Sequence, residues 1–248
     1  MNAEIKTARH THEAIKLKLH MRKLWTDHAI FTRMFIIDLI GDLPGMSYTI
    51  DRLDRSQEQT GNCFRPFFGD VAANKLTSLL KEHITIAVDL FKMIKIGNVA
   101  DATILEDQWA TNIENMSNLL CTANKYYSID ELTDIFRTYL ILTKYQFIAR
   151  IDGDYSAEIM YFDMGLNHIM RISDYLADGI VKEFFSEQSP DINQEADIYN
   201  STNVLEENIQ EENVLEENIQ DENVLEENIQ EENIFGNNVL NNNEIVDI

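Results

Sequence analysis

The chain of 248 residues has little of the two residue types that usually interrupt helices, with three prolines and nine glycines. Most of them fall between segments in which apolar residues recur every three or four positions, the spacing of one helix face. No run alternates apolar and polar residues for long enough to predict a strand. The sequence therefore predicts an all-α fold in which proline and glycine mark the connections.

Cysteine and long apolar runs are also scarce. Cys63 and Cys121 are too few for a disulfide framework, which indicates a reducing compartment. The longest apolar run, residues 29–40, includes two charges and is shorter than the roughly 20 residues of a membrane span. Residues 1–20 lack the apolar segment of a signal peptide. We therefore expect a soluble cytoplasmic or otherwise intracellular protein with no membrane span.

Positive charge is absent from the last quarter of the chain. All 20 Lys and Arg residues lie at or before Lys182, and residues 188–248 contain 17 Asp and Glu, so they carry −17 of the net charge of −23. Binding to nucleic acid needs clustered cations, so we do not expect this chain to bind it. The exclusion is firmer for the tail than for the first helix, which has a basic face formed by Lys16, Lys18, Arg22 and Lys23.

The acidic segment is an array of ten-residue repeats. The sequence Asn-Val-Leu-Glu-Glu-Asn-Ile-Gln-Glu-Glu at 203–212 recurs at 213–222, with Asp221 in place of one Glu, and at 223–232, and a degenerate copy occupies 233–242. Ten residues fall about 80° short of three helical turns, so the apolar stripe rotates and cannot stay on one partner. We expect residues 188–248 to be a disordered or transiently helical tail that can bind basic protein surfaces.

The rest of the chain predicts an up-and-down antiparallel helical bundle over residues 11–187, preceded by a flexible segment at 1–10. Short connections favour antiparallel neighbours. Ser128-Ile-Asp-Glu131 forms a capping box, and Asp154 can cap the helix that follows it. About five long helices are expected, at 11–40, 70–96, 101–123, 128–151 and 154–185, with one short helix at 47–62.

Two histidines, His28 and His83, lie in apolar stripes, where a polar ring needs a partner. Facing helices of a bundle can converge on a core metal, and Asp163 could join the two rings as a carboxylate ligand of iron, zinc or manganese. However, the Glu-x-x-His motif of di-iron bundles is absent. The simpler interpretation is that the rings hydrogen-bond to Asn112, to Thr32 or to each other.

Further polar candidates surround these histidines. Thr32 and Arg33 follow His28 by one turn, and an arginine this close to the core predicts a carboxylate partner or a bound anion. Trp109 and Asn112, one turn apart, are expected to fill and cross-link the core. The carboxylates that could pair with Arg33 are Asp89, Glu114 and Asp163.

Residues 23–37, which begin Lys-Leu-Trp-Thr-Asp-His and include Thr-Arg, resemble the first helix of a small all-helical family common in bacteria. The resemblance covers about 19–185 and implies no established activity. The repeat tail lies outside it and resembles additions carried by large DNA viruses, which would allow a location in the virion. Other points of resemblance are Thr60-Gly-Asn through Phe68-Gly69, Leu80-Lys-Glu-His-Ile84, Gln108-Trp-Ala-Thr-Asn112 and Cys121-Thr-Ala-Asn124. The recurring positions that it implies are Trp25, His28, Thr32, Arg33, His83, Trp109 and Asn112.

The sequence contains none of the common phosphate-loop, dinucleotide-binding or hydrolase motifs. We therefore expect a non-catalytic interaction or structural protein with an acidic tail and no cofactor. The alternative is a bundle with a buried metal or small-molecule site around His28, Arg33 and His83, with a transition metal ion as cofactor. The oligomeric state is left open.

Overall fold

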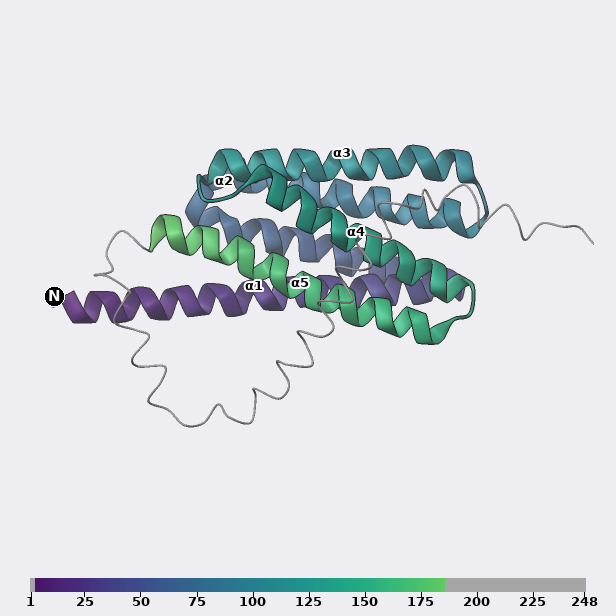
Figure 1. The fold of residues 1–248 in the computed structure, drawn as a ribbon, viewed down its shortest axis with the longest axis horizontal. Helices are drawn as coiled ribbons and strands as arrows, with labels where there is room; N and C mark the ends of the chain where they lie inside the picture. The colour runs from purple at the N-terminus through teal and green to yellow at the C-terminus, as the bar shows by residue number, and fades with distance from the viewer. Residues whose placement is uncertain (1–2, 186–248) are drawn as a thin grey trace, which may run out of the picture. The chain divides into compact units, whose positions relative to one another are not determined.

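The computed structural model describes residues 3–185, with side chains from His12 onward (Figure 1). Residues 3–185 contain no strand, so the predicted all-α fold is confirmed. The repeat tail predicted at 188–248 lies outside the described residues. The helices are α1 (Ala3–Ile40), α2 (Met46–Lys95), α3 (Val99–Ala123), α4 (Ile129–Ile151) and α5 (Tyr155–Phe184).

Helix α2 consists of two antiparallel halves that meet at Gly69. This glycine has φ 77° and ψ 174°, a combination that residues with a Cβ essentially never adopt. Lys81 Nζ lies 2.8 Å from Asp54 Oδ2, although 27 residues would span about 40 Å along a straight helix. The break predicted at Pro66 and Gly69 is therefore confirmed, but the helix before it continues past the predicted end at Asn62.

Close packing of the two halves of α2 depends on a second glycine. A Cβ added to Gly61 would lie 1.9 Å from Thr77 Oγ1 and 3.2 Å from the backbone oxygen of Ala73. Neither the β-branched Thr77 nor the helix backbone can move away easily. The missing side chain thus lets the two halves approach each other at this level.

The predicted caps of the last two helices are present, with one difference. Ser128 Oγ accepts a hydrogen bond from the backbone N–H of Glu131 at 3.4 Å, and Asp154 Oδ1 accepts one from Ala157 at 2.9 Å. The backbone N–H of Ser128 donates to the Tyr175 hydroxyl at 2.9 Å rather than to the Glu131 side chain. Only one of the two hydrogen bonds of the predicted capping box therefore forms, because the Tyr175 hydroxyl of α5 accepts the hydrogen bond predicted for the Glu131 side chain.

The helices form an antiparallel up-and-down bundle that closes on itself, as predicted. Each helix packs on the next along the chain, and α5 packs on α1 (Figure 1). Lys18 pairs with Asp178, whereas Arg33, further along α1, pairs with Glu158 near the start of α5, so these two helices run in opposite directions. Helix α1 begins at Ala3, inside the segment predicted to precede it, rather than at Thr11.

The core between the helices is rich in aromatic side chains. The rings of Phe91 in α2 and Phe147 in α4 stack with their centroids 4.5 Å apart, and Phe35 of α1 lies 6.4 Å from Phe91. All three are almost completely buried, which makes them large contributors to stability. None of the described helices combines the length and the apolar character needed to cross a bilayer.

Candidate functional site

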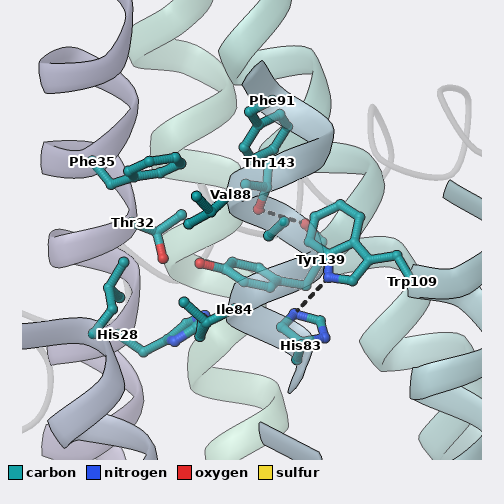
Figure 2. Close-up of a pocket in the computed structure, with 12 residues that line it drawn as sticks. His28, Thr32, Phe35, His83, Ile84, Val88, Phe91, Trp109, Tyr139 and Thr143 are labelled. Atoms are coloured by element: carbon teal, nitrogen blue, oxygen red, sulfur yellow. Dashed lines mark hydrogen bonds between the residues drawn. The ribbon is translucent and has the colours of Figure 1, made fainter. Parts of the chain in front are cut away.

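Polar side chains from four helices meet in the centre of this aromatic core, and we call them the histidine cluster. Figure 2 shows its members that line the first of two small cavities described below. Every member is at least nine-tenths buried. The cluster includes five of the six residues predicted for the pocket and leaves out Arg33. Its members are His28 and Thr32 of α1, Gln57 and His83 of α2, Trp109 and Asn112 of α3, and Tyr139 of α4.

His83 forms a hydrogen bond at each ring nitrogen. The indole N–H of Trp109 donates to His83 Nε2 at 3.2 Å, and an indole can only donate. Asn112 Nδ2 donates to the backbone oxygen of Leu79 at 3.0 Å, which leaves Asn112 Oδ1 to accept from His83 Nδ1 at 3.2 Å. His83 is therefore neutral with its proton on Nδ1, and neither nitrogen is left for a metal.

Burial, like these two hydrogen bonds, favours the neutral form of His83. It lowers the pKa of His83 to about 3, with a further lowering from the nearby His28 and a small opposite effect from Asn112. Protonation of Nε2 would place a second donor against the Trp109 indole. The predicted hydrogen bond between His83 and Asn112 is confirmed, as is the predicted role of Trp109 and Asn112 in cross-linking the core.

His28 is neutral for a similar reason but has a different partner. Gln57 Nε2 donates to His28 Nδ1 at 3.2 Å and to the backbone oxygen of Leu53 at 3.1 Å. His28 Nδ1 is thus an acceptor, so the neutral ring carries its proton on Nε2. Burial lowers the pKa of His28 to about 4. Gln57 was not among the partners predicted for this histidine.

Two small cavities lie beside the histidines. Each has a volume of about 20 Å³, and both are lined by His28, His83 and Tyr139. Thr32 lines the first cavity, and Trp25 and Gln57 line the second. A typical organic ligand needs a pocket of about 300–1,000 Å³, so these cavities match the size of a single water molecule.

Arg33 lies outside the histidine cluster and pairs with Glu158, not with Asp89, Glu114 or Asp163. Its Nε and Nη2 lie 2.9 Å and 3.0 Å from the two Glu158 oxygens, a bidentate arrangement. Glu158 is only 1% exposed.

Two further side chains reach the same carboxylate. Gln146 Nε2 donates to Glu158 Oε1 at 3.0 Å, and Arg150 Nη1 lies 3.5 Å from Oε2. Burial opposes ionisation of Glu158, but Gln146 and the arginines Arg33 and Arg150 outweigh it and lower its pKa. The carboxylate is therefore held in its charged form.

The predicted metal ligands do not come together. Asp163 is exposed on α5 and lines neither cavity, whereas His28 and His83 face both. Within the part of the chain that the structure describes, no group of three or more His, Cys, Asp or Glu side chains is placed to hold a metal ion. His168, also on α5, lies 2.7 Å through Nε2 from the backbone oxygen of Ile135 and so cross-links α5 to α4.

The sequence did not single out Gln57 or Tyr139 as polar members of the cluster, nor Glu158 as the partner of Arg33. Gln57 follows the buried Leu53 by one turn, so its spacing places it on the buried face. Glu158 follows Asp154 by one turn at a helix start, where an acidic residue is usual and gave no reason to expect burial.

Comparison with known protein families, with curated proteins and with solved structures finds no match to this chain. The fold and the histidine cluster alone define its class. It is an all-α antiparallel bundle with a buried, neutral and hydrogen-bonded polar core.

Proposed function

We propose that this protein is a non-catalytic interaction or structural protein whose acidic tail binds basic protein surfaces. The distribution of charge carries this proposal, since residues 188–248 contain 17 acidic residues and no Lys or Arg. Each full repeat presents four acidic residues at the same spacing, so one tail offers several equivalent sites. Such binding is electrostatic and weakens as salt screens the charges.

The histidine cluster supports a structural role for the helical bundle. Its two central histidines are neutral and hydrogen-bonded, and the cavities beside them have the size of a water molecule. A catalytic site usually offers a larger pocket with reactive groups directed into it. The arrangement favours stabilisation of the core over the alternative of a metal or small-molecule site.

The basic face of α1 is a poor partner for the acidic tail. Lys16 pairs with Glu13, Lys18 with Asp178, Arg22 with Asp174 and Lys23 with Asp27, at 2.5–3.5 Å. Each cation already has a nearby carboxylate, so the face offers little uncompensated positive charge. This pairing favours a basic partner outside the chain and adds to the argument against nucleic acid.

We place this function in an intracellular compartment. Cys63 and Cys121 are both free thiols in the structure, which is usual in a reducing environment. A virion location follows only from the resemblance of the repeats to viral additions, and that resemblance stays a prediction. The same holds for the resemblance of residues 19–185 to a bacterial helical family.

The proposal is tested with the full chain and poly-L-lysine as the basic probe. Binding is followed by titration calorimetry at several salt concentrations. We expect affinity to fall by about tenfold or more as NaCl rises from about 50 to about 300 mM. A variant with all Glu and Asp of the three full repeats changed to Gln and Asn should lose binding.

The control variant keeps the acids and replaces the Val, Leu and Ile of the same repeats with alanine. If charge drives the interaction, this variant binds poly-L-lysine as the unmodified chain does. Equal binding by the charge-neutralised variant would refute the proposal.

A further inference from the structure

We infer that two ordered water molecules bind inside the bundle, one at Thr32 and one at Trp25, and that they complete the histidine cluster. The Trp25 indole N–H is buried and has no hydrogen-bond partner among the described residues, and the buried Thr32 hydroxyl has only a contact with the Tyr139 hydroxyl that falls short of normal hydrogen-bond geometry. Each lines one of the two cavities of about 20 Å³. A buried water needs such a volume and two to four polar neighbours.

The orientation of Thr32 differs from that of other threonines in these helices. The hydroxyls of Thr60, Thr85 and Thr143 donate to the backbone oxygen one turn earlier, at 3.0, 3.1 and 2.8 Å. Thr32 lacks this bond, and its hydroxyl faces the nearby Tyr139 hydroxyl, beside the first cavity that both residues line (Figure 2). The side chain is thus directed toward the interior and away from its own helix.

The two tryptophans also differ in their hydrogen bonds, and Trp25, the one without a protein acceptor, lines the second cavity. The indole N–H of Trp109 donates directly to His83 Nε2 at 3.2 Å. The indole N–H of Trp25, a residue that is also buried, has no protein acceptor within the described residues. An indole N–H can be satisfied only by an acceptor, and a water oxygen in the adjoining cavity supplies one.

Each cavity also provides the further polar neighbours that a bound water requires. The Tyr139 hydroxyl faces Thr32 in the first cavity. Gln57 lines the second, and because its nitrogen serves His28 and Leu53, its other amide atom is the oxygen, which can accept a hydrogen bond. His28, which carries its remaining proton on Nε2, lines both.

These neighbours select water rather than an ion. Both histidines are neutral, and neither cavity is lined by an Asp, Glu, Lys or Arg of the described residues that could balance an anion or a cation. Water can donate and accept at once, which suits both the hydroxyls of the first cavity and the indole donor and amide oxygen of the second. The waters then link α1 to α4 through Thr32 and Tyr139, and α1 to α2 through Trp25 and Gln57.

The first test uses the unmodified full chain, which contains only two tryptophans. With ¹⁵N-labelled tryptophan, each indole N–H gives its own NMR signal, and the Trp25→Phe variant identifies the signal of Trp25. We expect a rotating-frame cross-peak between water and the Trp25 indole proton, and none at Trp109. A cross-peak at neither indole, or an equal one at both, would overturn the inference for this site.

The second test counts long-lived waters by oxygen-17 magnetic relaxation dispersion. Thr32→Val removes the hydroxyl with little change of shape, and the count should fall by one relative to the unmodified chain. Thr60→Val is the matched control, because the Thr60 hydroxyl is buried but already bonded to its own helix. An unchanged count in Thr32→Val, or the same loss in Thr60→Val, would overturn the Thr32 site. If Thr32→Val does not fold, the tryptophan experiment still tests internal hydration.

Discussion

Mild acid should destabilise the bundle because folding keeps His28 and His83 neutral. Burial lowers the pKa of His28 from 6.5 to about 4 and that of His83 from 6.5 to about 3. Since both folded values lie below the unfolded value, the unfolded chain binds more protons once the pH falls below 6.5. The stabilisation is therefore complete above this pH and is lost progressively toward the folded pKa values.

The size of the effect follows from proton linkage. Near pH 5.5 each histidine is almost fully protonated in the unfolded chain and almost fully neutral in the folded one, which gives about 1.2 kcal/mol per pH unit. Between about pH 7 and pH 5 the two residues together remove about 4 kcal/mol, a large part of the 5–15 kcal/mol typical of a domain. His168 adds to this loss because its pKa is also lowered by burial.

Urea denaturation of the full chain, followed by circular dichroism at several pH values, measures this slope. Glu106 acts in the opposite direction, because burial raises its pKa and its contribution is lost as the pH rises. The informative quantity is therefore the difference in slope between the unmodified chain and His28→Gln, which should be about 1.2 kcal/mol per pH unit near pH 5.5.

The control for this measurement is His20→Gln, since His20 is exposed on the same helix. We expect this variant to keep the slope of the unmodified chain. A slope that does not change in His28→Gln would refute the assignment of His28 as a neutral buried ring. So would a free energy of unfolding that stays constant between about pH 7 and pH 5 in the unmodified chain.

Three further perturbations test other parts of the structure. Glu158→Gln should lower the free energy of unfolding in urea by about 2–3 kcal/mol, because it leaves two partly buried arginines without their shared carboxylate, whereas Asp163→Asn on the exposed face should change it little. Gly61→Ala should lower the free energy of unfolding by about 1–3 kcal/mol through overpacking. Gly165→Ala is the control, because its Cβ would meet its nearest neighbour at 3.7 Å, and it should be neutral or slightly stabilising. Equal effects of the two substitutions would contradict the packing argument. Adding Zn²⁺ or a chelator should leave the thermal midpoint within about 2 °C, and a larger shift would indicate that the histidine cluster binds metal.

The helices could be predicted from the sequence because their ends are marked locally. Asp154 caps α5, and half of the predicted bond pattern at Ser128 is present. Gly69 interrupts α2 where the sequence predicts a turn. The start of α1 has no such local mark, because residues 3–10 contain neither proline nor glycine. The helix was therefore predicted to begin at residue 11, whereas it begins at Ala3.

The partners within the core could be predicted only in part. His83 and Asn112 were matched correctly, but Gln57, which bonds to His28 from the first half of α2, was not, although both pairs are 29 residues apart. Periodicity tells which side chains point inward and does not tell which of them meet.

The same core keeps one kind of titratable group neutral and another charged, and the partners decide which. His83 faces the donor-only Trp109 indole on one side and the Asn112 oxygen on the other, an arrangement that only a neutral ring satisfies. Glu158 faces Arg33, Arg150 and an amide donor, so ionisation is favoured despite burial. Because the pKa of Glu158 is lowered, its contribution to stability is lost only below its usual range. Acid should therefore weaken the bundle in two successive steps of the same sign, first through the histidines below pH 6.5 and then through Glu158.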